Sequence, residues 1–303
     1  RGSWKVRVSV RHGESRAPFP RTSPAMARGG APTASRCLSC ASRPTCTIMH
    51  DRVRAALPPA PLPPKSVFRR RLPDELVAYS SRQGRSYFGE AMRENAMEPF
   101  FALSEQFTTQ AEPTFCALGS LTMVMNALGV DPRRKWKDEP GPGWRWWADE
   151  MFVPEGSCLP SIDVLRRDGV GLEDFATLAA ANGATVELHT AGPAGGEGIG
   201  SFRAAIMEAS QTCDSFAIVN FCRATLGQTG NGHFSPIGGY HRASDSVLVL
   251  DVARFKYPPY WVKVPRLWDA TQTTDELTGD ARGWMRVAAA DAAADAPADA
   301  PAD

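Results

Sequence analysis

Residues 113–129 have the sequence PTFCALGSLTMVMNALG. The apolar side chains recur at steps of three and four, the spacing of one face of an α-helix: Leu118, Leu121, Met125 and Leu128. Gly129 follows at a position where glycine commonly ends a helix, and Pro113 lies just upstream. The stretch therefore predicts an apolar helix that begins at Cys116.

The segments around this helix predict helices first and strands later. Three further helical segments are expected, at 88–107, 172–179 and 202–209. The strands are expected at 185–189, 216–222, 234–240 and 247–252, with a turn at 242–245. Because helices precede most of the strands rather than alternating with them, this order predicts an α+β fold and not a wound parallel sheet.

The composition is that of a globular chain. Its 303 residues carry a formal net charge of +1 and 43% of them are hydrophobic, enough to bury a core. No stretch approaches the ~18 consecutive apolar residues of a membrane-spanning helix, and near-zero net charge argues against nucleic acid as the main partner. Seven cysteines, an odd number, do not suggest a disulfide framework, so a reducing, cytoplasmic compartment is expected.

Two terminal segments differ from the middle of the chain. Residues 1–64 hold eleven basic and two acidic residues and ten of the 25 prolines. This composition is typical of a disordered arm or, alternatively, of a transit peptide for a plastid or mitochondrion. Residues 288–303 contain only Ala, Asp and Pro, which predicts a low-complexity tail. One folded domain is therefore expected at 65–287.

Cys116 is the first candidate for chemistry. In the first turn of a helix, unpaired backbone N–H groups and the helix dipole favour an anion. A thiol there can lose its proton near neutral pH, and the thiolate is the nucleophilic form. The alternative is that Cys116 is a small buried hydrophobic residue at the start of an apolar helix.

His233 and Asp251 could supply a base and the carboxylate that orients it. His233 enters one predicted strand after Gly230-Asn231-Gly232, and Asp251 closes the next. Such a pair on neighbouring antiparallel strands is a recurrent way to fix an imidazole. With a four-residue turn, however, His233 faces position 254, three residues past Asp251. A bulge at Gly238-Gly239 could close that gap, and the alternative is a structural histidine.

Three other polar residues are candidates for the same site. Gln110 lies six residues before Cys116, where its amide could join the Cys116 N–H in an oxyanion hole. Arg254 and Lys256 could hold a substrate carboxylate, although such residues are usually surface charges. The other histidines are expected to be solvated, and the tryptophans at 144, 146 and 147 to be core or a packed loop.

Four stretches are more specific in combination than any single residue: TQAEPTFCALGSLTMVMNALGVDPRRKWK (109–137), GWRWWADEMF (143–152), QTGNGHFSPIGGYH (228–241) and VLVLDVARFKYPPYWV (247–262). Together they resemble the phytochelatin synthase family, over about residues 68–287. Within them, GHFSPIGGY and DVARFKYPP are highly specific for that family.

The resemblance implies a papain-like cysteine peptidase fold, with the nucleophile on the helical part and His and Asp on an antiparallel sheet. Carried over by residue, it implies that Cys116 is the nucleophile, His233 the general base, Asp251 the orienting carboxylate and Gln110 the oxyanion glutamine. It also implies that the sheet closes the gap to Asp251.

The chain departs from the family pattern in several places. Ala117 follows the nucleophile where the family usually has Gly, and its methyl is expected where substrate backbone passes. Residues 191–200 resemble an insertion, and a usual pair of adjacent cysteines is reduced to Cys158. The Cys-rich C-terminal domain of plant members is replaced by the Ala/Asp/Pro tail, which puts metal sensing in doubt rather than the core chemistry.

The implied activity is that of a glutathione gamma-glutamylcysteinyltransferase, which makes phytochelatins from glutathione through a thioester on Cys116. The implied partners are glutathione and phytochelatins. Cadmium or zinc is expected to arrive mainly as a metal–glutathione thiolate, so the protein needs no metal site of its own and no organic cofactor. One alternative is a hydrolase that releases glycine and γ-Glu-Cys. A remote one is a non-enzymatic thiol buffer for metals, whose clustered cysteines would be Cys37, Cys40 and Cys46.

Overall fold

The computed structural model describes residues 67, 69–137, 143–153, 160–191, 198–276 and 278–290. The arm predicted at 1–64, the tail beyond residue 290, Cys158 and most of the loop at 191–200 lie outside the described residues. None of the helices in the described part is both long enough and apolar enough to cross a membrane.

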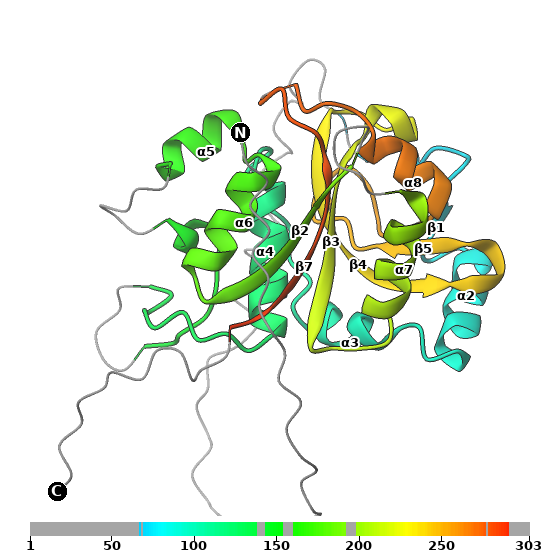
Figure 1. Ribbon diagram of the computed structural model, residues 1–303, viewed down its shortest axis with the longest axis horizontal. Helices are drawn as coiled ribbons and strands as arrows, with labels where there is room; N and C mark the ends of the chain where they lie inside the picture. The colour runs from blue at the N-terminus through cyan, green and yellow to red at the C-terminus, as the bar shows by residue number, and fades with distance from the viewer. Residues whose placement is uncertain are drawn as a thin grey trace, which may run out of the picture. The chain divides into compact units, whose positions relative to one another are not determined.

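The central element is a seven-stranded antiparallel sheet with the strand order β1-β6-β5-β4-β3-β7-β2 (Figure 1). The strands are β1 (Val77–Ala78), β2 (Ala184–Thr190), β3 (Ser215–Cys222), β4 (Gly232–His241), β5 (Ser246–Val249), β6 (Tyr260–Lys263) and β7 (Gly283–Ala289). Combined with the helices, this sheet confirms the predicted α+β class.

Helices cover both faces of the sheet (Figure 1). They are α2 (Arg82–Arg93), α3 (Glu98–Glu105), α4 (Cys116–Ala127), α5 (Ile162–Asp168), α6 (Leu172–Ala181), α7 (Ile199–Ala209) and α8 (Val264–Thr271), with 3-10 turns η1 (Asp149–Phe152), η2 (Ala224–Leu226) and η3 (Arg242–Ser244). In β3, Phe216 and Ile218 pack in the core that contains α4, whereas Val219 and Phe221 pack in the core that contains α7 and α8. The strand is therefore apolar on both faces.

Helix α4 confirms the first sequence prediction. It begins at Cys116, and every residue from Ala117 to Met125 is buried. Leu128 caps the helix, and Gly129 follows with φ of 66°, a left-handed conformation that glycine adopts without steric cost. The buried length of the helix fixes the position of its first residue, because α4 packs against the centre of the sheet through β4.

Other elements differ in extent from the predictions. The helical stretch expected at 88–107 is two helices, α2 and α3, because the chain turns at Asn95 with φ of 54°. Strand β5 ends at Val249, before Asp251. Strand β7 runs to Ala289, so the folded domain continues two residues past the predicted boundary at 287, since Ala288 pairs with both β2 and β3.

The predicted bulge is present in the hairpin of β4 and β5. Ile237 pairs with Val249 and Gly239 pairs with Leu248, so Gly238 is an extra residue on β4. Because side chains alternate between faces, an offset of three residues would put Asp251 on the face opposite His233. The bulge reduces the offset to two, which returns Asp251 to the same face, within diagonal reach of His233.

Candidate active site

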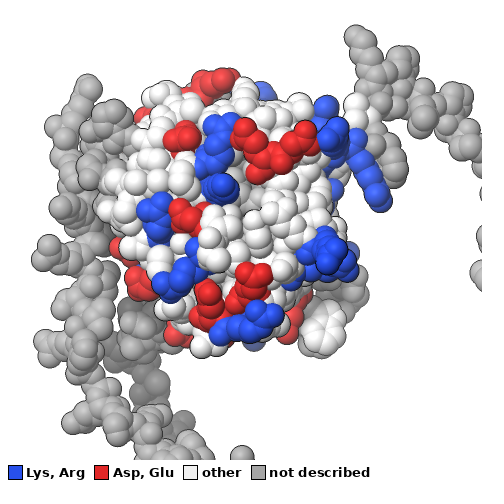
Figure 2. Space-filling model, turned by 90° about the vertical axis from the view of Figure 1, so that its right-hand side faces the viewer, with Lys and Arg blue, Asp and Glu red and all other residues white. Residues whose placement is uncertain are grey.

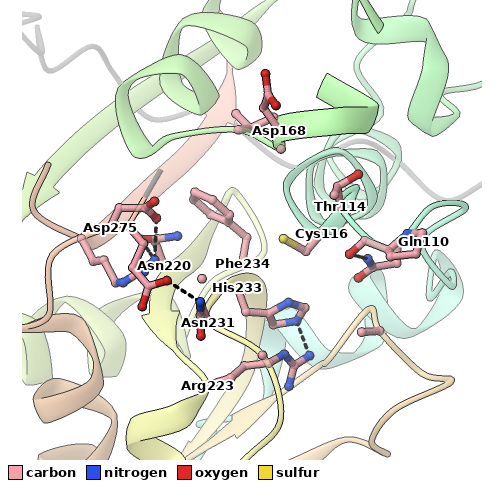
Figure 3. A pocket seen from close by; sticks show the side chains of 18 of the residues that line it. Gln110, Thr114, Cys116, Asp168, Asn220, Arg223, Asn231, His233, Phe234 and Asp275 are labelled. Atoms are coloured by element: carbon pink, nitrogen blue, oxygen red, sulfur yellow. Dashed lines mark hydrogen bonds and ion pairs between the residues drawn. The ribbon is translucent and has the colours of Figure 1, made fainter. Parts of the chain in front are cut away.

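A cavity of about 470 Å³ opens at the start of α4. Cys116 and His233 both line it, and in Figure 3 the sulfur and the imidazole face this space from the helix and from β4. Gln110 and Lys256 are also among the lining residues, whereas Arg254 is not. Its volume falls in the range of small-molecule sites, roughly 300–1,000 Å³.

The Cys116 thiol is the first residue of α4 and is free of any disulfide. Burial raises its pKa above the ordinary thiol value, outweighing the backbone N–H groups of Phe234 and Ala117 and the charge of Arg223. The expectation that the helix terminus alone would lower this pKa is therefore wrong for the resting site. To become a nucleophile, the thiol needs a base that accepts its proton.

His233 is held by Asp251 in the way that such a base requires. Its Nε2 lies 2.9 Å from Asp251 Oδ1, and His233 and Asp251 are 3% and 0% exposed. Asp251 Oδ1 also accepts the N–H of Ala253 at 2.9 Å. The use of Nε2 for this contact leaves Nδ1 as the ring nitrogen available for the thiol. Despite burial, the hydrogen bond with His233 and the guanidinium of Arg223 help to keep the pKa of Asp251 low, at about 2.

Arg223 is a member of this cluster that the sequence analysis missed. It follows β3 directly, is 1% exposed, and places Nη2 2.8 Å from both carboxylate oxygens of Asp251. The same nitrogen lies 2.9 Å from His233 Nε2. Its only signal in the sequence is a charged residue at the end of an apolar strand, which is equally typical of a solvated strand end.

Gln110 lies beside the start of α4, and its side-chain amide already donates two hydrogen bonds. Its Nε2 donates to the carbonyls of Glu112 at 2.8 Å and Pro113 at 2.9 Å, and its buried Oε1 has no hydrogen-bond partner. Gly119 permits this proximity, because a Cβ there would come within 3.2 Å of Gln110 Cβ. Donation to an oxyanion therefore requires that one of the two carbonyl bonds be exchanged.

The two predicted cations differ in position. Lys256 is half-buried at the cavity, and burial lowers its pKa. Arg254 is exposed and stacks on the ring of Phe107, with Cζ 4.6 Å from the ring centroid. Only Lys256 can reach a ligand in the cavity from its present position.

A second polar group at the cavity, formed by Arg282, Asp275 and Asn220, was also not predicted from the sequence. Arg282, which is 1% exposed, donates from Nη1 to Asp275 Oδ2 at 2.6 Å and to Asn220 Oδ1 at 3.3 Å. A Cβ at Gly232 would come within 2.7 Å of that guanidinium, so the glycine before His233 makes room for it. Figure 3 shows Asp275 and Asn220 across the cavity from Cys116, with Phe234 between them.

Ala117 does not lie where substrate was expected to pass. It is 1% exposed, belongs to the hydrophobic core, and is not among the residues lining the cavity. Its methyl therefore faces the core. His241, expected to be solvated, is also buried, and it bonds Ser244 through Nδ1 and Glu90 through Nε2.

Within the described residues, the remaining candidates form no second chemical centre. Trp147 is buried, whereas Trp144 is 81% exposed. Among the described residues, no group of three or more His, Cys, Asp or Glu side chains is placed to hold a metal ion. Cys158 and the cysteines at 37, 40 and 46 lie outside the described residues. On the face in Figure 2, basic and acidic side chains are interspersed.

A thiol at a helix start and an imidazole bonded to a buried carboxylate are the groups of a nucleophilic cysteine site. The family model for phytochelatin synthase matches residues 67–284, and the chain belongs to this family.

Curated relatives come from plants and a fungus. Glutathione gamma-glutamylcysteinyltransferase 1 of Lotus japonicus is 44% identical over 223 residues, which is 73% of this chain and 42% of the relative. Glutathione gamma-glutamylcysteinyltransferase 2 of Arabidopsis thaliana is 41% identical, over 74% of this chain and 47% of the relative. The glutathione gamma-glutamylcysteinyltransferase of Schizosaccharomyces pombe is 38% identical, over 73% of this chain and 51% of the relative. The chain thus spans about half the length of the relatives it matches.

Proposed function

We propose that this protein is a gamma-glutamylcysteine dipeptidyl transpeptidase that makes phytochelatins from glutathione through a thioester on Cys116. The observation that carries the proposal is the Cys116–His233–Asp251 arrangement at the cavity of a phytochelatin synthase family member. The names of the curated relatives, which are glutathione gamma-glutamylcysteinyltransferases, support the choice of substrate.

In the first half-reaction, His233 Nδ1 takes the Cys116 proton as the sulfur attacks the carbonyl carbon of the Cys–Gly bond of glutathione. The oxyanion that forms is stabilised by the Cys116 N–H and by the Gln110 amide, once that amide exchanges a carbonyl partner. The C–N bond then breaks, His233 returns the proton to the amine, and glycine leaves. The product is a γ-Glu-Cys thioester on Cys116.

In the second half-reaction, the α-amine of another glutathione or of a growing phytochelatin attacks the thioester. His233 accepts the proton of that amine and returns a proton to the Cys116 sulfur as the C–S bond breaks. Water competes as a nucleophile, so transfer requires an acceptor held in place. Well-oriented groups reach effective molarities of ~10⁵ M or more, which is enough to favour the amine.

The Arg282–Asp275 pair fits the γ-glutamyl end of the donor. That end carries an α-ammonium and an α-carboxylate on one carbon, and the pair offers one carboxylate and one guanidinium 2.6 Å apart, with Asn220 beside them. Because the pair lies across the cavity from the thiol, a bound γ-glutamyl head would leave the cysteinyl carbonyl to face Cys116. The substrate contact expected of Arg254 is thereby assigned instead to Arg282.

The metal enters this proposal as part of the substrate. Glutathione thiolates bind soft and borderline ions such as cadmium and zinc, and a metal bridge between two glutathione sulfurs would bring an acceptor with its amine. Such a complex links turnover to heavy metal and makes the reaction a route of metal detoxification.

Product analysis by mass spectrometry tests the proposal. The wild-type chain and Cys116→Ser are incubated with millimolar glutathione, with and without cadmium. We expect (γ-Glu-Cys)₂-Gly that depends on the metal in the wild type and no product in Cys116→Ser. Release of γ-Glu-Cys and glycine alone would identify a glutathione hydrolase, and the absence of glycine release in both conditions would exclude either enzyme.

A further inference from the structure

Arg223 is a buried cation with a dense set of partners. Nη2 contacts Asp251 Oδ1 and Oδ2 at 2.8 Å each, and Nη1 donates to Gln228 Oε1 at 2.5 Å. The guanidinium carbon also lies 5.4 Å from the ring centroid of Tyr257. A buried guanidinium is costly unless it is fully paired, and here the pairing is with the carboxylate that holds His233.

The backbone leaves Arg223 little freedom to move away. Its N–H donates to the carbonyl of Asn231 at 2.7 Å, and its own carbonyl accepts the N–H of Gln228 at 2.9 Å. These bonds close the loop between β3 and β4, so the residue that carries the guanidinium is tied to the strand that carries His233. The geometry of the cation and the geometry of the imidazole are set by the same loop.

Two neighbours of opposite kind meet at one ring nitrogen. His233 Nε2 lies 2.9 Å from Asp251 Oδ1, which only accepts a hydrogen bond, and 2.9 Å from Arg223 Nη2, which only donates. When Nε2 carries the proton, it donates to Asp251 and leaves a lone pair on Nδ1. The adjacent guanidinium then opposes a second proton on the ring.

The charged groups around His233 have unequal effects. Burial and the charge of Arg223 lower the pKa of His233 to about 4, Lys256 acts in the same direction, and Asp251 acts against them. The other titratable neighbour is the Cys116 thiol, whose pKa burial raises. All four groups therefore bear on which member of the Cys116–His233 pair holds the proton.

We propose that Arg223 is a positioning residue, which holds Asp251 by both oxygens against His233 Nε2, offsets the carboxylate charge and keeps the ring neutral. The resting site is then a thiol beside an imidazole, rather than a thiolate–imidazolium ion pair. Proton transfer to Nδ1 occurs as substrate is attacked. The inference rests on the proposed function only in taking His233 as the base for Cys116.

Nuclear magnetic resonance of the whole chain with isotope-labelled histidine, without glutathione, tests this directly. The chain has five histidines, and the signals are assigned with single glutamine variants of the other four, His12, His50, His189 and His241. At pH 5.5, where a free histidine is mostly protonated, we expect wild-type His233 to be neutral with its proton on Nε2. A charged ring at that pH, or a proton on Nδ1 instead, would overturn the proposal with no variant needed.

Substitutions of Arg223 and of Asp251 are expected to shift the titration midpoint of His233 in opposite directions. In Arg223→Gln the titration midpoint of His233 rises by at least one pH unit, in Arg223→Lys it lies between that value and the wild type, and in Asp251→Asn it falls. If Arg223 had only a structural role, the titration midpoint of His233 would be the same in wild type and Arg223→Gln. That result would overturn the proposal. Because no turnover is measured, this result is independent of whether the chain transfers γ-Glu-Cys, hydrolyses glutathione or does neither.

Discussion

At the scale of single residues, the site depends on a few polar atoms placed by a buried framework. Cys116 is positioned by α4, and His233 by β4. Three further polar residues line the same cavity and come from segments without a distinctive sequence pattern: Arg223, Asp275 and Arg282. Substitutions at these positions therefore separate chemistry from binding.

Replacement of Gln110 tests its part in the oxyanion hole. Gln110→Ala removes the amide proposed to join the Cys116 N–H in the oxyanion hole, and the loss of one such donor commonly lowers kcat by about 10²–10³-fold. Steady-state release of glycine from glutathione measures the effect, with Gln106→Ala as a control because Gln106 does not line this cavity. A loss smaller than about tenfold, in a variant with an unchanged unfolding transition, would limit Gln110 to its two backbone hydrogen bonds.

Replacement of Asp275 tests the subsite for the γ-glutamyl head. Asp275→Asn removes the charge that would pair with the substrate α-ammonium, a loss typical of about 1.5–3 kcal/mol, or roughly 10–100-fold in kcat/KM. Asp269→Asn on the exposed side of α8 is the matched control. An unchanged kcat/KM for glutathione in Asp275→Asn would show that the head binds elsewhere.

The sequence predicted Cys116, His233 and Asp251 because each lies in a segment with a clear local pattern or a specific motif. It could not predict Arg223 or Arg282 in the same way. Arg223 pairs with Asp251, 28 residues away in the sequence, and Arg282 pairs with Asn220, 62 residues away. Such pairs form only after the sheet assembles. Arg254 was assigned to the cavity by proximity in sequence, but it lies outside and stacks on Phe107.

At the scale of elements, one extra residue in β4 decides whether the base and its carboxylate meet. Gly238 is that residue, and Gly239 after it packs against the turn between α2 and α3. The need for a bulge followed from counting residues across the hairpin, because side-chain direction in a strand has a period of two. The length of β5 was not predictable from its apolar run, since Leu250 continues the pattern after the strand has ended.

Enlargement of the glycine after the bulge should destabilise this hairpin. A Cβ at Gly239 would lie 2.2 Å from Met97 Sδ and 2.8 Å from the carbonyl oxygen of Ala96. Because the second contact is with backbone, Gly239→Ala is expected to lower the free energy of unfolding by about 1–3 kcal/mol. Denaturant unfolding followed by circular dichroism measures it.

Gly200→Ala is the control for that substitution. Gly200 is the second residue of α7, where a Cβ would meet nothing within 4 Å, so alanine is expected to leave the free energy of unfolding unchanged or slightly raised. Equal effects of the two substitutions would contradict the close approach at Gly239.

At the scale of the whole molecule, the buried pair makes stability depend on pH. The pKa of His233 is about 4 in the folded protein against 6.5 for an ordinary histidine, so between these values the unfolded chain binds a proton that the folded chain does not. Acidification from pH 6.5 to 4 therefore lowers stability. The contribution of Asp251, with a pKa of about 2, is lost only at lower pH.

Thermal unfolding at a series of pH values across this range checks that stability falls on acidification. We expect the wild type to lose on the order of 2 kcal/mol of stability between pH 6.5 and 4, and His233→Gln to lose less over the same range. Gly200→Ala, which removes no titratable group, is the control and should keep the wild-type slope. An identical slope in His233→Gln and wild type would contradict the depressed pKa of His233.

The central claim is that Cys116 carries the γ-Glu-Cys acyl group between two glutathione molecules. Intact-protein mass spectrometry after rapid acid quenching, followed by peptide mapping, tests it most directly. We predict a mass increase of one γ-Glu-Cys group on the peptide that contains Cys116, absent in Cys116→Ser and released as product when glutathione is added back. Two results would contradict the account: an acyl group on a residue other than Cys116, or turnover of glutathione by the wild type without any acyl-enzyme.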